Sequence, residues 1–363
     1  MAQTAISRRA LNRALLARQM LLQRVEDPVE EVVGRLVAMQ AQEPRPPFIG
    51  LWSRIAGFDR AEAIRLLHER RLVRASTLRG TLHLMTAADY AAFNATVQQG
   101  PEGARAILKD RMDGLDIPAV IARARELFAE RPQTFTEIRT GLAKAFPNVQ
   151  DDRAMGFTAR MSLPLAAVPD DTPWGFRADP IFTNADTWLG KELNAQADIR
   201  GLLLRYLAAF GPATAGDFQA WSALKGGKEA MESLRPELVS LRDDRKRELF
   251  DLPDAPRPSE DVPAPVRYIA DYDNLILSHV DRTRIVADEH RPRIVSKNLR
   301  VAATFLVDGF VAGTWQTTAK KKAATLTLSP FVDLGKRTLE ELEDEGLRLL
   351  RFLEPGASEY SVQ

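Results

Sequence analysis

The clearest hydrophobic pattern in the chain lies between Asp27 and Gln42. Apolar residues recur there at the spacing of one helical face: Val29, Val32, Val33, Leu36 and Val37. The pattern predicts a helix with Asp27 as its N-cap, which ends before Pro44 because a residue that precedes proline is disfavoured in the helical region. Gln40 is the next residue on the apolar face. We therefore expect Gln40 at the C-terminal end of this helix and Gln42 in the turn beyond it.

The residues that follow predict a β-hairpin. A helix is expected over residues 59–70, and strands over 72–77 and 81–85 are joined by a turn at 78–80. Helices followed by a two-stranded hairpin give the element order of a winged helix.

The middle of the chain repeats this order twice. Helices are expected over residues 118–130 and 195–210, and each is followed by the pattern P-x-T-x-x-acid-apolar, at 132–138 and at 212–218. Each copy continues into a strand, a turn and a second strand, over 165–183 and 238–251. The pattern predicts three tandem winged helices.

The C-terminal part is expected to form a separate α+β unit. Five prolines between residues 251 and 265 mark a linker, and strands are expected over 301–307, 310–316 and 324–328 before a helix over 336–353. The predicted fold class is thus α+β. The predicted units are winged helices at 1–100, 101–190 and 191–252, followed by a β-rich unit with a terminal helix at 266–363.

Composition narrows the function classes. The chain of 363 residues is 45% hydrophobic and 27% charged, which is typical of a globular protein, and it has no cysteine. Its four histidines show no H-x-x-x-H spacing, so we expect neither a metal nor another cofactor. No apolar run has the length of a signal peptide or a membrane span, and we expect a cytoplasmic, nucleoid-associated protein.

The net charge of +1 hides an uneven distribution. Residues 1–80 and 281–337 are rich in arginine and lysine, whereas residues 338–363 are acidic. Two basic regions suit a polyanion that contacts part of the surface. The alternative is that the 39 arginines lie on faces covered by salt bridges.

Motifs of common enzyme classes are missing, and attention falls on Gln40-Ala41-Gln42. The sequence has no G-x-S-x-G, P-loop, G-x-G-x-x-G or H-E-x-x-H. An amide on a core-facing position costs about 1 to 3 kcal/mol if it is unsatisfied. Gln40 must therefore either cap carbonyl groups at the helix end or line a cavity.

The sequence resembles the AlkZ-like DNA glycosylases, a superfamily of tandem winged-helix proteins that excise bulky N7-alkylated guanines and unhook interstrand crosslinks. Four segments carry the resemblance: residues 36–54 with L-V-A-M-Q-A-Q-E-P-R, 77–84 with T-L-R-G-T-L-H-L, 271–284 with D-Y-D-N-L-I-L-S-H, and 306–315 with L-V-D-G-F-V-A-G-T-W. The resemblance implies that Gln40 and Gln42 are the catalytic residues. It places the chain in the Gln–Gln branch, which is associated with resistance to DNA-alkylating natural products.

The implied chemistry needs no strong base. Guanine alkylated at N7 is already cationic, so its glycosidic bond can break without protonation of the leaving group. Two amide carbonyls can hold the attacking water beneath C1′ and stabilise an oxocarbenium-like sugar. The expected partner is damaged or crosslinked double-stranded DNA, bound by a monomer.

Several basic residues are candidates for DNA contact. They are Arg45, Arg54 and Arg79 around the motif, His83 in the hairpin, and Lys320, Lys321 and Lys322 after a predicted strand. The alternatives are surface salt bridges for the arginines, a buried core or hairpin position for His83, and a solvated loop for the lysines. At the level of the whole protein, the alternatives are a winged-helix transcription regulator without enzymatic activity and a scaffold that binds protein.

Overall fold

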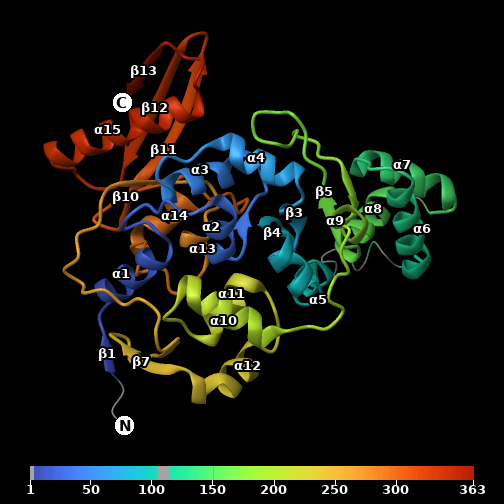
Figure 1. The fold of residues 1–363 in the computed structure, drawn as a ribbon, viewed down its shortest axis with the longest axis horizontal. Helices are drawn as coiled ribbons and strands as arrows, with labels where there is room; N and C mark the ends of the chain where they lie inside the picture. Colours follow the sequence, from blue (N-terminus) through green and yellow to red (C-terminus); the bar gives the residue numbers. More distant parts are fainter. Residues whose placement is uncertain (1–3, 105–110, 112–114, 150) are drawn as a thin grey trace.

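The computed structural model describes residues 4–104, 111, 115–149 and 151–363, and it combines helices with three β-sheets. Figure 1 shows the C-terminal strands and their helix at one end of the molecule and the helices α6 (Ile117–Glu130), α7 (Phe135–Ala145) and α8 (Asp152–Ser162) at the other. No helix of the described residues is long and apolar enough to span a membrane.

The N-terminal part contains the predicted hairpin. Strands β3 and β4 pair in antiparallel fashion around a 3-10 turn and confirm the strands expected from the sequence. The elements in chain order are β1 (Thr4–Ile6), α1 (Arg8–Arg18), α2 (Val29–Leu36), β2 (Met39–Gln40), α3 (Arg45–Arg54), α4 (Arg60–His68), β3 (Leu72–Ser76), the 3-10 turn (Leu78–Gly80), β4 (Leu82–Thr86) and α5 (Ala87–Ala104).

The helix predicted between Asp27 and Gln42 is shorter than expected. Pro28, and not Asp27, occupies the N-cap position, and the helix ends at Leu36. Val37 has φ 65° and ψ −59°, and the Ala38 N–H donates to the Leu36 carbonyl at 2.7 Å. This geometry is a strained γ-turn, which is rare for a β-branched residue. The prediction that Gln40 continues the helix was wrong, because this turn sends the chain into strand β2.

The repeated motif of the middle segment forms two equivalent helix starts. Thr134 with Glu137, and Thr214 with Asp217, each make a complete capping box. The elements are α6 (Ile117–Glu130), α7 (Phe135–Ala145), α8 (Asp152–Ser162), β5 (Leu165–Ala167), β6 (Phe182–Asn184), α9 (Ala185–Leu189), α10 (Ile199–Phe210), α11 (Ala215–Ser222), α12 (Gly227–Leu234), a 3-10 helix (Arg235–Glu237), β7 (Val239–Asp243) and β8 (Glu248–Asp251).

The C-terminal part is a meander that packs against an amphipathic helix. Strands β9 to β13 form one sheet in the order β13-β12-β11-β10-β9, and α15 has the bounds predicted for it. The elements are β9 (Arg267–Ile269), α13 (Asn274–Leu277), a 3-10 helix (Asp288–His290), α14 (Arg291–Ile294), β10 (Thr304–Val307), β11 (Phe310–Lys320), β12 (Ala323–Pro330), α15 (Lys336–Leu353) and β13 (Glu359–Val362).

Hairpins of different segments join in common sheets. The pair Ala75–Ala166 links β3 to β5, which gives a five-stranded sheet in the order β2-β4-β3-β5-β6. In the three-stranded sheet, the N-terminal strand β1 pairs in parallel with β7, which comes from a segment more than 200 residues later in the chain. The division into three winged helices and a C-terminal unit remains a prediction.

The core also crosses the predicted boundaries. One hydrophobic cluster contains residues from Leu15 to Val311, and another joins Ile49 of α3 to the C-terminal sheet. The buried side chains of Arg18 and Asp251 form an ion pair at 2.7 Å between α1 and β8. These contacts hold the surroundings of Gln40 as one packed assembly.

Candidate active site

Strand β2 places Gln40 inside the protein. Gln40 pairs with His83 of β4, and only 9% of the residue is exposed. The γ-turn at Val37 lies three residues before Gln40 and sets the direction in which the chain leaves α2 and enters β2. The position of the Gln40 amide is therefore determined by a strained turn on one side and a β-ladder on the other.

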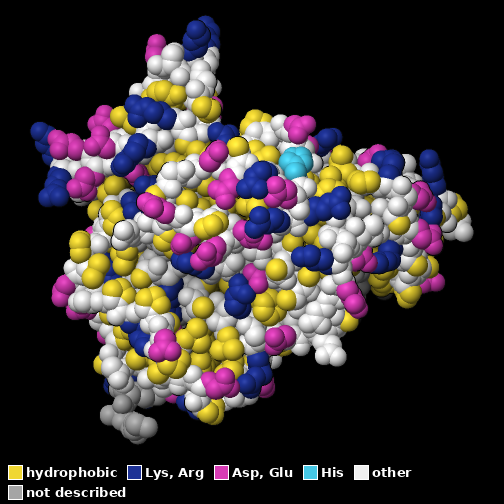
Figure 2. All heavy atoms as spheres, in the orientation of Figure 1, with side chains coloured by type: hydrophobic (Ala, Val, Ile, Leu, Met, Phe, Trp, Pro, Cys, Tyr) yellow, Lys and Arg dark blue, Asp and Glu magenta, His cyan; other side chains and the backbone are white. Residues whose placement is uncertain are grey.

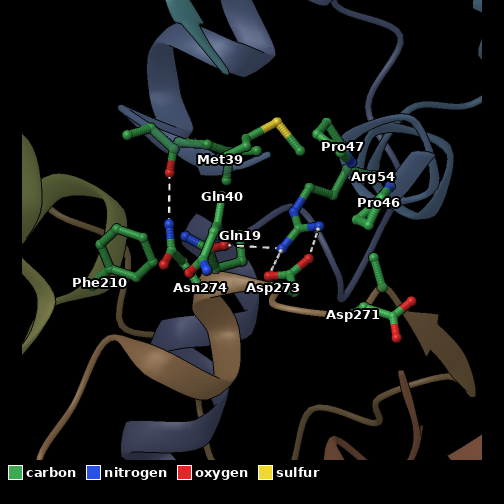
Figure 3. Close-up of a pocket in the computed structure, with 13 residues that line it drawn as sticks. Gln19, Met39, Gln40, Pro46, Pro47, Arg54, Phe210, Asp271, Asp273 and Asn274 are labelled. Atoms are coloured by element: carbon green, nitrogen blue, oxygen red, sulfur yellow. Dashed lines mark hydrogen bonds and ion pairs between the residues drawn. The ribbon is translucent and has the colours of Figure 1, made fainter. Parts of the chain in front are cut away.

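Gln40 lines a small cavity of about 20 Å³. A space of this size holds roughly one water molecule. Its lining combines apolar side chains from α2, α3 and α10 with six polar ones, which are Gln19, Gln40, Arg54, Asp271, Asp273 and Asn274 (Figure 3). The surface of this cavity is largely apolar, so the few polar groups that border it, the Gln40 amide among them, determine where a water can be held.

The structure does not bring Gln42 to the same cavity. Gln42 is exposed, and its Oε1 accepts a long hydrogen bond from the Leu82 N–H at 3.4 Å. The cavity lining includes Gln40 but not Gln42. The backbone between the two glutamines is held by Arg74, which donates to the carbonyl oxygens of Ala41 and Gln42 at 2.8 and 3.0 Å.

Arg79 lies directly beside Gln40. Its Nη2 donates to Gln40 Oε1 at 2.9 Å and to Asn274 Oδ1 at 3.2 Å, and its Nη1 donates to the carbonyl of Trp221. Burial, with a smaller contribution from Arg282, lowers the pKa of Arg79 to about 10, so the side chain stays cationic at neutral pH.

His83 is fully buried under the same group. Burial and the neighbouring Arg79 lower the pKa of His83 to about 3, so the imidazole is neutral at physiological pH. Its Nδ1 lies 3.1 Å from the Thr81 carbonyl. A DNA contact by His83 has no support in this geometry, because the ring has no exposed surface.

Arg54 is also buried, and the geometry does not support the predicted DNA contact for it. Its guanidinium pairs with both oxygens of Asp273 at 2.8 and 3.0 Å, and it donates to the Gly50 carbonyl and to Gln19. The side chain is 1% exposed. Arg54 links α3 to the segment before α13 and has no free donor directed to solvent.

Arg45 lies at the start of α3, next to the C-terminal sheet. It donates to the Thr317 hydroxyl of β11 at 2.8 Å, and its Nε is buried without a hydrogen-bond partner. Burial lowers the pKa of Arg45, while Glu354 and Asp271 act in the opposite direction. The described residues form no ion pair with Arg45, which leaves its charge available to an anion that approaches this edge.

Lys320, Lys321 and Lys322 form the tip of a hairpin. Strands β11 and β12 pair up to Lys320 and Ala323, and Lys321 takes the left-handed conformation that closes the turn, with φ 54°. All three residues are exposed. Figure 2 shows basic side chains at the end of this projection, whereas acidic and basic side chains are mixed over the rest of the same face.

Two residues near Gln40 were not selected from the sequence as site residues. Asn274 lines the cavity and donates to the Ala38 carbonyl at 2.7 Å. Arg74 sits within a strand and carried no recognisable signal. In the described residues, no group of three His, Asp or Glu side chains has the arrangement of a metal site.

The family model for AlkZ-like DNA glycosylases matches residues 33–352. The chain belongs to the AlkZ-like DNA glycosylase family. A curated relative, an interstrand DNA cross-link repair glycosylase of Streptomyces sahachiroi, is 23% identical over 365 residues, which cover 93% of this chain and 94% of the relative. The resemblance that the sequence motifs indicated is thereby confirmed.

A solved structure shows the same fold. The Streptomyces sahachiroi DNA glycosylase AlkZ matches with a TM-score of 0.80 at 20% identity, over 99% of this chain and all of that one. The predicted α+β class is confirmed. Membership of the AlkZ-like family also confirms the prediction of a DNA glycosylase that acts on DNA, and it makes the transcription regulator and the protein-binding scaffold unnecessary as explanations.

Proposed function

We propose that this glycosylase hydrolyses the N-glycosidic bond of bulky or crosslinked N7-alkylguanine, with Gln40 and Gln42 positioning the attacking water. The observation that carries the proposal is the one-water cavity against the buried Gln40 amide. The printed name of the curated relative, which refers to repair of interstrand crosslinks, supports the substrate class.

The electrostatics of the site suit a leaving group that is already activated. Gln40 is neutral at every physiological pH, and the nearest histidine, His83, has its pKa lowered to about 3 by burial and by Arg79. Amide groups are poor proton acceptors, and they act by orienting water and by presenting fixed dipoles to the developing positive charge on the sugar. Unmodified guanine lacks the N7 charge, so this mechanism leaves it intact.

Gln42 has a different part in the proposal from Gln40. It is exposed and does not line the cavity, and the bond that its Oε1 accepts is the long one from the Leu82 N–H. A bond of 3.4 Å is weak, and the Gln42 side chain can leave it for a water at the DNA surface at little cost. Gln40 would hold the inner side of the water and Gln42 the side that faces the sugar.

DNA would lie across the edge that carries the β11–β12 hairpin. The exposed Lys320, Lys321 and Lys322 and the unpaired cation of Arg45 supply contacts for phosphate groups on this edge. Backbone contacts of this kind fix the position of the duplex without reading its sequence, which suits an enzyme that recognises damage. We expect the protein to act as a monomer in the cytoplasm.

The test is release of a modified base. Duplexes with a nitrogen-mustard monoadduct or crosslink at guanine N7 are incubated with enzyme and treated with alkali, which cleaves the strand at abasic sites. Cleavage above spontaneous depurination is expected for the native protein and should be lost in Gln40→Ala and Gln42→Ala, while DNA binding persists. Variants with the native excision rate would refute the roles of the two glutamines.

A further inference from the structure

Arg79 is a partly buried cation whose partners among the described residues are all neutral. The described residues offer it no carboxylate, and its contacts are the amides of Gln40 and Asn274, the carbonyl of Trp221 and, at 3.5 Å, His83 Nε2. Burying an unpaired guanidinium is costly. The contacts that the Arg79 guanidinium makes should therefore show what it contributes to the site.

The atoms of Gln40, Asn274 and Trp221 that contact the Arg79 guanidinium are all acceptors. Arginine has donors only, so the Gln40 atom beside it must be the carbonyl oxygen and not the amide nitrogen. Asn274 is fixed in the same way, because its Nδ2 donates to the Ala38 carbonyl at 2.7 Å, a bond that Figure 3 shows as a dashed line. This leaves the Asn274 Oδ1 to accept from Arg79. If the Nδ1–H of His83 donates to the Thr81 carbonyl, its Nε2 is the free acceptor.

The backbone conformation of Arg79 is also closely constrained. Arg79 has φ 56°, which a residue with a side chain seldom adopts, and its turn rests on α5 at Gly100. A Cβ at Gly100 would lie 2.9 Å from the Thr77 carbonyl oxygen and 3.0 Å from the Arg79 nitrogen. The absence of a side chain at this helix position therefore allows the close approach that brings the guanidinium to Gln40.

We propose that Arg79 is a positioning residue for Gln40 and does not bind the DNA backbone. By holding Oε1, it fixes which way the Gln40 amide faces, and the second lone pair of that oxygen stays available at one place in the cavity. This role rests on the proposed function of Gln40. It differs from the phosphate contact expected from the sequence, and the two roles predict different measurements.

A double-mutant cycle tests the proposal. The single-turnover rate of base release is measured on a duplex with one nitrogen-mustard monoadduct at guanine N7, for the native enzyme, Arg79→Met, Gln40→Asn and the double variant. We expect Arg79→Met to slow the native enzyme roughly 100-fold, because a small displacement of a positioned group has effects of this size. In the Gln40→Asn background the same change should cost about threefold or less, since the amide it orients no longer reaches the cavity.

The salt dependence of binding provides the second measurement. We expect Arg79→Met to leave the slope of log K against log salt unchanged, whereas loss of one phosphate contact would reduce the slope by about 0.9. Arg337→Met is the matched control, because Arg337 is 91% exposed on α15 and should affect neither quantity. If Arg79→Met fails to fold, Arg79→Lys carries the test, since it keeps the charge and loses the forked geometry.

The outcomes separate the two proposals. Equal losses in both backgrounds, or a reduced salt slope, would overturn the positioning role of Arg79 and leave the role of Gln40 intact. A native rate for Gln40→Ala would instead overturn the proposed function. A native rate for both Arg79 variants, in a protein that needs Gln40, would show that the amide is oriented without Arg79.

Discussion

Replacing Arg54 by methionine tests whether this arginine stabilises the fold or contacts a DNA phosphate. Arg54 makes two bonds to Asp273 at 2.8 and 3.0 Å, and the two side chains are 1% and 6% exposed. Methionine fills much of the same volume but leaves the Asp273 carboxylate buried without its partner. Removal of one member of a buried ion pair destabilises a protein by about 3 to 5 kcal/mol.

This loss can be expressed as a shift in melting temperature. With an unfolding entropy of roughly 2.1 cal/mol/K per residue, a chain of 363 residues loses about 1.3 °C per kcal/mol. We therefore expect Arg54→Met to melt about 4 to 7 °C lower, by scanning calorimetry. The double variant Arg54→Met with Asp273→Asn should recover part of this loss, because the buried charge is then removed as well.

DNA binding provides the contrast for the same variant. At a temperature where Arg54→Met is folded, the slope of log K against log salt should equal that of the native protein, since Arg54 has no donor directed to solvent. Arg337→Met again serves as the exposed control. An unchanged melting temperature together with a slope reduced by about 0.9 would refute the reasoning and restore Arg54 as a phosphate contact.

Two further predictions concern the hairpin tip and His83. Replacing Lys320, Lys321 and Lys322 together by alanine should reduce the slope of log K against log salt by up to about 0.9 for each lost phosphate contact. The single-turnover excision rate at saturating enzyme should stay at the native value. Burial and Arg79 lower the pKa of His83 from 6.5 to about 3. Between these two pH values His83 is protonated in the unfolded chain and neutral in the folded one. Stability should therefore be full above about pH 6.5 and fall toward pH 3, and His83→Asn should reduce this fall in melting temperature.

Local signals in the sequence were enough for many elements of the fold. The helix over 336–353 and the hairpin at Asp308-Gly309 carry their own amphipathic and turn patterns, and both are present in the structure. The two capping boxes explain why the motif at Thr134 and Thr214 begins a helix each time. In these segments a few neighbouring residues determine the structure.

The candidate site could be predicted from the sequence only in part. The motif identified Gln40 and Gln42, but the apolar periodicity placed Gln40 on a helix, because nothing in the residue type of Val37 indicates φ 65°. Arg54 looks like a surface group in the sequence and is buried in the structure, since its carboxylate partner Asp273 lies in a distant segment. His83 is buried as well, and here the apolar strand around it already favoured a core position. Periodicity describes one element at a time and does not report which distant carboxylate or carbonyl will meet a cation.

The origin of the groups around Gln40 limits how far the motif alone can define the enzyme. Gln40 comes from β2 and Arg79 from the hairpin turn. The carbonyl of Trp221 lies in the last turn of α11, and Asn274 is the first residue of α13. The predicted boundary at residue 100 separates the first two from the others. A fragment limited to residues 1–100 would keep both glutamines and Arg79, yet the guanidinium would lose two of the acceptors that fix it. The orientation of the Gln40 amide is therefore a property of the assembled chain, and the packing between segments that the sequence assigns to different units is part of the site itself.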